Sequence, residues 1–153
     1  MGKQLFFILL LAFSFLNIQA QTENLNYNKQ LADSLGADEY GMRSYYLVIL
    51  KTGTAKIEDK EKLGELFRGH FDNINKMAKE KYLVIAGPLE KNELSYRGIF
   101  ILDAKSEEEV ISLMNGDPTI TAGIFTYEIM KWYGSAAIPL YLKYHDTIEK
   151  KKI

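Results

Sequence analysis

The chain has 153 residues, of which 47% are hydrophobic and 25% are charged, with no cysteine and a formal net charge of −1 at neutral pH. This length fits one globular domain, and the composition excludes a disordered chain, disulfides, thiol nucleophiles and a lipid-modified N-terminal cysteine. A charge so close to zero provides no electrostatic basis for binding nucleic acid or an anionic membrane.

Residues 1–20 have the layout of a secretory signal peptide. Lys3 gives a positive start, 5–16 form an almost unbroken apolar run, and Ala20 is a small residue before Gln21. The apolar run is short for a transmembrane helix. We therefore expect cleavage near Gln21 and an exported protein, periplasmic or extracellular, without stable membrane insertion after processing. The alternative is an uncleaved membrane anchor.

Residues 21–42 form a polar lead-in segment, in which 29–35 are expected to form a short helix that ends at Gly36. The main domain is expected at 43–135. Residues 136–153 form a C-terminal extension that ends in a lysine run. We expect an added helix there, lying over the domain or over a partner.

The main domain alternates strand and helix patterns. Strands are predicted from runs of β-branched and aromatic residues, and helices from an apolar stripe and from a capping box at Ser106 to Glu109. The order β-α-β-β-α-β predicts an α+β, ferredoxin-like fold, in which a four-stranded antiparallel sheet has both helices on one face. The predicted strands are 45–50, 82–86, 98–103 and 125–133, and the predicted long helix is 59–81.

Two helices protect only one face of such a sheet, so the other face needs a cover or contains a site. A homodimer formed through the sheets is the usual solution. We expect the partner to bury alternate residues of the first and last strands, such as Tyr46 or Val48 and Tyr127 or Ile129. A monomer would instead use the C-terminal extension as the cover.

Two residues are candidates for acid-base chemistry. His70 lies near the middle of the apolar stripe of the long helix, where it is either a proton-transfer group or a core histidine bonded to a backbone carbonyl. Spacing alone favours the core histidine. Asp117 precedes Pro118, an arrangement typical of a helix cap. A cap can also bind a histidine, because a carboxylate has two oxygens.

Three further residues are candidates for substrate binding. Pro88 follows the second strand, Arg97 could hold an anionic group or remain solvated, and Trp132 could line a pocket or pack in the core. Two histidines, at positions 70 and 145, do not have the spacing of a zinc site. Phosphate loops and dinucleotide fingerprints are absent from the sequence. No metal and no cofactor are therefore expected.

Three motifs together resemble the YciI-like (YCII-related) proteins. They are His70 on the first long helix, Ala86-Gly87-Pro88 after the second strand, and Asp117-Pro118 with Gly123 before the last strand. The resemblance covers roughly 45–132. It extends more weakly into 36–42 and 132–137, which resemble a secreted subgroup of the family.

The resemblance implies a dimeric α+β barrel whose cleft contains a His-Asp pair, here His70 and Asp117. One relative is a dehydrochlorinase, so the implied activity is lyase-like acid-base chemistry on a small molecule, with Arg97 pairing an anionic group. The alternatives are a non-catalytic binding or assembly module, and a monooxygenase acting on haem or a quinol. The signal peptide and the C-terminal extension depart from the family pattern and argue against a cytosolic role.

Overall fold

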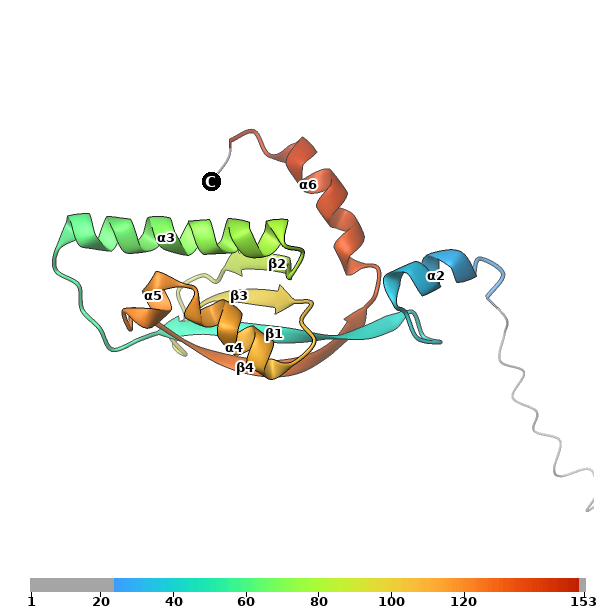
Figure 1. Ribbon diagram of the computed structural model, residues 1–153, viewed down its shortest axis with the longest axis horizontal. Coiled ribbons are helices and arrows are strands. Elements are labelled where there is room, and N and C mark those ends of the chain that lie inside the picture. The colour runs from blue at the N-terminus through green and yellow to red at the C-terminus, as the bar shows by residue number, and fades with distance from the viewer. Residues whose placement is uncertain (1–23, 152–153) are drawn as a thin grey trace, which may run out of the picture.

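The computed structural model describes residues 24–151 (Figure 1). The predicted signal peptide at 1–20 lies outside this range. Within the described part of the chain, every helix is too short or too polar to span a lipid bilayer. The elements are α2 (Lys29–Leu35), β1 (Met42–Thr52), α3 (Lys60–Lys79), β2 (Leu83–Pro88), β3 (Tyr96–Leu102), α4 (Glu107–Asn115), α5 (Pro118–Thr121), β4 (Phe125–Ser135), the 3-10 helix η2 (Ile138–Tyr141) and α6 (Leu142–Ile148).

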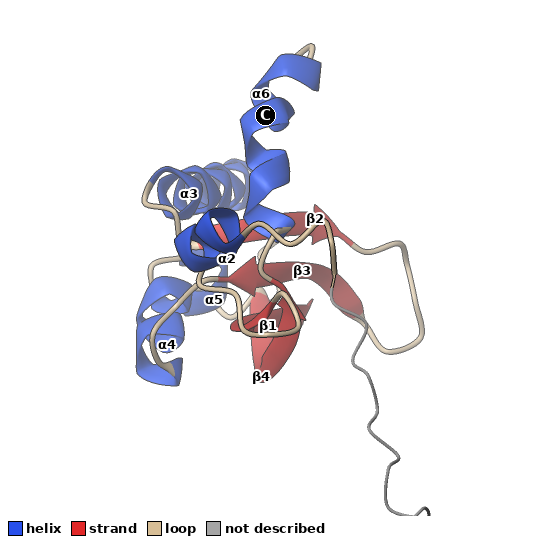
Figure 2. Ribbon diagram, turned by 90° about the vertical axis from the view of Figure 1, so that its right-hand side faces the viewer, coloured by secondary structure: helices blue, strands red, loops and turns tan. Residues whose placement is uncertain are grey.

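The four strands form one antiparallel sheet in the order β2-β3-β1-β4. Figure 2 shows α3, α4 and α5 on one side of this sheet. The connection from β1 through α3 to β2 passes over β3, and the connection from β3 through α4 and α5 to β4 passes over β1. This arrangement confirms the predicted ferredoxin-like α+β fold.

The long helix α3 begins at a cap and follows its apolar stripe. The Asp59 side chain accepts hydrogen bonds from the backbone N–H groups of Glu61 and Lys62, which have no partner inside the helix. The buried residues of α3 are Leu66, His70, Asn73 and Met77. Their spacing of three and four residues places them on one face. His70 is therefore buried by the same periodicity that builds the core.

The main core lies between the sheet and the helices α3 and α4. Its buried members are Tyr46, Val48, Leu50, Met77, Leu83, Phe100, Leu102, Val110 and Met114. Burying a side chain of this size stabilises the fold by about 1.5–3 kcal/mol relative to leaving it in water. This core fixes the position of α3 relative to the strand β3.

One prediction about the sheet faces is wrong. Tyr46 and Val48 belong to the core under the helices, and Tyr127 and Ile129 pack against the same core. None of these four residues lies on the helix-free face. Strand alternation defines two residue sets but does not say which set meets the helices, and in β1 both sets are apolar.

The opposite face carries a second apolar cluster. Tyr45, Val84 and Ile101 are its buried members, and Leu47, Ile85, Trp132 and Ile138 pack against them. Ile138 comes from η2, so the start of the C-terminal extension covers one end of this face. Met130, which pairs with Leu47 across β1 and β4, remains 42% exposed. The centre of the face is thus apolar and partly open to solvent.

Candidate functional site

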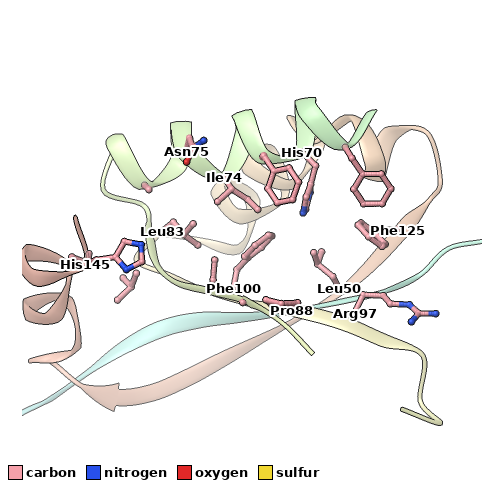
Figure 3. Close-up of a pocket in the computed structure, with 18 of the residues that line it drawn as sticks. Leu50, His70, Ile74, Asn75, Leu83, Pro88, Arg97, Phe100, Phe125 and His145 are labelled. Carbon is pink, nitrogen blue, oxygen red and sulfur yellow. The ribbon is translucent and has the colours of Figure 1, made fainter. Parts of the chain in front are cut away.

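The centre of the candidate site is His70, half-way along α3. The residue is 8% exposed, and its ring points from the helix into a cavity (Figure 3). Its Nδ1 atom lies 2.5 Å from Oδ2 of Asp117. The ring makes edge contacts with the aromatic rings of Phe67, Phe71 and Phe125. These rings limit the access of water to the imidazole.

Asp117 is fully buried and uses its two oxygens differently. Its Oδ1 accepts hydrogen bonds from the backbone N–H of Thr119 at 2.9 Å and from the Thr119 hydroxyl at 2.6 Å. Its Oδ2 faces His70. The residue is therefore both the N-cap of α5 and the partner of the histidine, which are the two alternatives that the sequence left open.

A glycine brings these two elements together. A Cβ atom at position 69 would lie 2.5 Å from Cγ of Pro118, closer than two carbon atoms can approach without a shift. Gly69 therefore lets the first residue of α5 pack directly on α3. The sequence carried a signal for this contact, because a glycine inside a helix costs about 1 kcal/mol relative to alanine and usually has a packing reason.

The electrostatics of the pair indicate an ionised aspartate. Burial raises the pKa of Asp117. The hydrogen bonds from His70 and Thr119 and the charge of His70 lower it by more than burial raises it, so the pKa lies below its ordinary value. An ionised carboxylate can only accept, so we assign the bonding proton to Nδ1 of His70. Among residues 24–151, no side chain or backbone group is hydrogen-bonded to the other ring nitrogen, Nε2. That nitrogen is therefore available to a ligand.

The cavity has a volume of about 770 Å³ and lies between α3 and the β2–β3 half of the sheet (Figure 3). Its walls are largely apolar, which is typical of sites that bind small organic molecules. The apolar lining includes Leu50, Phe67, Phe71, Ile74, Leu83, Phe100 and Phe125, and the polar lining includes His70, Asn75, Arg97, His145 and Glu149.

Two of the predicted substrate-binding residues line this cavity. Pro88 lies at the end of β2, beside the start of β3. Arg97 donates from Nε to the hydroxyl of Thr52 at 2.6 Å, and its guanidinium extends away from His70 (Figure 3). Arg97 is exposed. Its charge therefore lies at the rim of the cavity.

The third predicted residue does not belong to this cavity. Trp132 packs on the opposite face of the sheet, where its ring centroid lies 5.8 Å from that of Tyr45. A Cβ atom at position 134 would lie 2.3 Å from the Trp132 ring, so the indole lies over Gly134. Strand alternation explains the difference, because Phe125, which does line the cavity, is seven positions earlier and so points to the other face.

Several lining residues carry no sequence pattern that marks them as part of a site. Tyr141, Leu142, His145 and Glu149 all come from the C-terminal extension. In the sequence, His145 lies 75 positions from His70 and is not part of any metal-binding motif. Within residues 24–151, no three histidine or acidic side chains gather as metal ligands would. The cavity therefore has two histidines that belong to different elements.

Comparison with known proteins identifies the family. Residues 44–133 match the family model of the YCII-related domain. The chain belongs to the YCII-related family. This match runs from Ser44 in β1 to Tyr133 in β4, includes both His70 and Asp117, and stops before the C-terminal extension.

Other comparisons add little to this YCII-related assignment. No curated protein is significantly similar in sequence. Among solved structures, the chain is similar to a 5-chloro-2-hydroxyhydroquinone dehydrochlorinase from Burkholderia phenoliruptrix, in complex with 2,5-dihydroxybenzoquinone. The two share 18% identity over 57% of this chain and 92% of that one, with a TM-score of 0.41. A likeness of this size says nothing about the chemistry of the cavity.

Proposed function

We propose that this YCII-related protein binds a small, largely apolar organic molecule and performs acid-base chemistry on it without a cofactor. One observation supports this most directly. The Nδ1 atom of His70 lies 2.5 Å from a buried carboxylate, while the ring points into a cavity of about 770 Å³. A histidine held in this way has a fixed tautomer and a free nitrogen at the ligand.

The proposed step is a proton abstraction that leads to elimination. Nε2 of His70 takes a proton from carbon, the C–H electron pair forms a new double bond, and an anionic leaving group departs with its own bonding pair. Asp117 keeps the ring in the required tautomer and stabilises the imidazolium that forms. The proton then passes to water. Arg97 is proposed to meet an anionic substituent at the rim.

We also propose the setting in which this chemistry takes place. The N-terminal pattern supports export and membership of a secreted subgroup, with the mature protein periplasmic or extracellular. The apolar, partly exposed sheet face around Leu47 and Met130 supports a homodimer. A second copy on that face would complete the α+β barrel implied by the resemblance.

The test combines binding and turnover. Hydroxybenzoates and chlorinated hydroquinones are screened against the mature protein by thermal shift, because a ligand that binds the folded state stabilises it increasingly as its concentration rises above Kd. Chloride release is then measured for the chlorinated probes. We expect His70→Ala to reduce the rate by a factor of about 10²–10⁴, the usual contribution of a general base.

Controls separate the pair from general damage to the fold. Asp117→Asn should reduce chloride release while probe binding changes only a few-fold, because the amide cannot stabilise the imidazolium. Asp72→Asn makes the same chemical change at an exposed position of α3 and should have no effect. If the probes bind but none is turned over, the non-catalytic binding module becomes the better description.

A further inference from the structure

The C-terminal extension contributes to the cavity although it lies outside the family match. The match ends at residue 133, whereas Tyr141, Leu142, His145 and Glu149 line the cavity. We propose that this extension forms the second half of the ligand site, and that His145 binds the end of the ligand farthest from His70. This inference rests on the proposed function, since it concerns the same cavity.

A β-bulge provides the attachment point for the extension. The pairing of β2 with β3 shifts between Leu83 and Ile85, which leaves Val84 without a partner in the ladder. The Tyr141 hydroxyl donates to the carbonyl oxygen of Val84 at 2.5 Å. Burial of this hydroxyl raises the pKa of Tyr141. The bulge thus presents a backbone acceptor at the edge of the sheet, and Tyr141 uses it.

The start of the extension is attached on the other face of the sheet. Ile138 of η2 packs in the cluster that contains Tyr45 and Trp132. The chain therefore passes from the helix-free face, past the edge strand β2, to the cavity. These two attachments hold α6 against the cavity.

One side of this terminal segment faces the cavity. Its lining residues, at positions 141, 142, 145 and 149, have the spacing of a single helical face. Tyr144 and Lys143 do not line the cavity. His145 is exposed, as they are, but it lies on the side of the helix that faces the cavity. Figure 3 shows His145 at one end of the cavity and His70 toward the other, with Leu83, Ile74 and Phe100 between them.

This arrangement defines a class of ligand. Small-molecule sites span roughly 300–1,000 Å³, so a volume of about 770 Å³ is more than a single aromatic ring needs. An apolar middle with an imidazole toward each end suits an elongated molecule, such as a two-ring aromatic compound, with one polar group at each end. A neutral imidazole has one nitrogen that donates a hydrogen bond and one that accepts, so either a hydroxyl or a carboxylate of the ligand can bind His145.

The test uses two probes of different length with the full mature chain. The one-ring probe is 4-hydroxybenzoate, and the two-ring probe is 4'-hydroxybiphenyl-4-carboxylate. We expect His145→Ala to weaken the two-ring probe about five- to tenfold, the effect of losing one hydrogen bond, and to leave the one-ring probe unchanged. Tyr141→Phe removes the donor to Val84 and should weaken the two-ring probe by a smaller factor. Tyr144→Ala, on the same helix but outside the cavity, is the matched control.

Ring NMR signals give a readout that a purely structural role would not produce. The chain has two histidines, so each ring signal can be assigned from a single variant. The two-ring probe should shift the signals of both His70 and His145, and the one-ring probe only that of His70.

Specific outcomes overturn the inference. Equal effects of His145→Ala on both probes, or no effect on either, would remove His145 from the site. So would a two-ring probe that leaves the His145 signal unshifted. In those cases a one-ring probe that still depends on His70 would leave the proposed function intact. A protein that binds neither probe at millimolar concentration would overturn both proposals.

Discussion

Asp117 connects two structures through one buried carboxylate. One oxygen closes the first turn of α5 through Thr119, and the other binds the imidazole of His70. A buried charge is tolerated here because both carboxylate oxygens accept hydrogen bonds, Oδ1 from Thr119 and Oδ2 from His70. Substitution of this residue therefore acts on local structure and on the histidine together.

The acid side of the stability profile provides the first prediction. The folded-state pKa of Asp117 is depressed below its ordinary value of 3.8, so its contribution to stability is present above that pH and is lost as the pH falls through the folded pKa. Asp117→Asn should lower the free energy of unfolding by about 1–3 kcal/mol at pH 7, with a smaller deficit toward pH 3. Urea unfolding between pH 7 and pH 3 measures this difference.

The matched comparison is Asp72→Asn, an exposed carboxylate on α3. It should leave the profile close to that of the wild type. A constant gap between the wild type and Asp117→Asn across the whole pH range would show that the charge of Asp117 does not contribute.

The sequence predicts the residues of the pair better than their surroundings. The motif around Asp117 and the apolar stripe around His70 are both local patterns, so they can be recognised without a structure. The hydroxyl of Thr119 and the small volume of Gly69 matter only because α5 packs on α3. That contact joins segments almost fifty residues apart. A glycine inside a helix suggests close packing, but no local pattern identifies Pro118 as the residue that packs there.

At the scale of elements, the contact between α3 and α5 limits what position 69 can hold. Gly69→Ala should favour the helix by about 1 kcal/mol through propensity alone. The added Cβ would meet Pro118 Cγ at 2.5 Å, and overpacking of this kind typically costs about 1–3 kcal/mol. We expect a net loss of stability. We also expect weaker probe binding, because the added Cβ would push α5 away from α3 and so move Asp117, the cap of α5, away from His70.

Gly64→Ala is the control for this second prediction. A Cβ at position 64 meets only the end of the Arg68 side chain, at 3.7 Å. This variant should be more stable than the wild type by up to about 1 kcal/mol, by thermal or urea unfolding. If both alanine variants stabilise equally, the close approach at Pro118 is not a constraint.

The sequence predicts where the helices and strands begin and end, but not which side of the sheet each strand residue faces. The short helix α2 has the predicted bounds, because Asn28 caps its start and Gly36 ends it in a left-handed conformation. Tyr46 was expected on the wrong side of the sheet, and Trp132 packs in the cluster on the helix-free face. In β1 both alternating sets are apolar, so neither set marks the solvent side and only the packed helices decide its faces.

At the scale of the whole molecule, the helix-free face predicts self-association. Met130→Lys places a charge near the centre of that face, where desolvation would oppose a dimer. We expect the wild-type protein to be a dimer at micromolar concentration and the variant to be a monomer with a similar melting temperature. Light scattering after size exclusion measures both masses.

The control for the dimer is Ile111→Lys, the same kind of change on the exposed side of α4. It should remain dimeric. A wild-type monomer would mean that η2 and the edge of the sheet protect the face well enough without a second copy.

Export is the remaining prediction at this scale. Native protein should begin near Gln21 and be lighter than the translated chain by about two kilodaltons, the mass of a segment of signal-peptide length. Intact-mass measurement on protein from the producing cell decides this. Retention of Met1 on a membrane-bound form would contradict it.

The walls of the cavity cross the boundary of the family domain. Leu50 and Phe100 come from within residues 44–133, whereas His145 comes from the segment that follows. A segment outside the family domain can change in length or sequence without disturbing the sheet. Two members of the family with the same His-Asp pair could then accept different molecules. To infer the substrate of one member from that of another, the segments that follow the domain must therefore be compared as well as the domains.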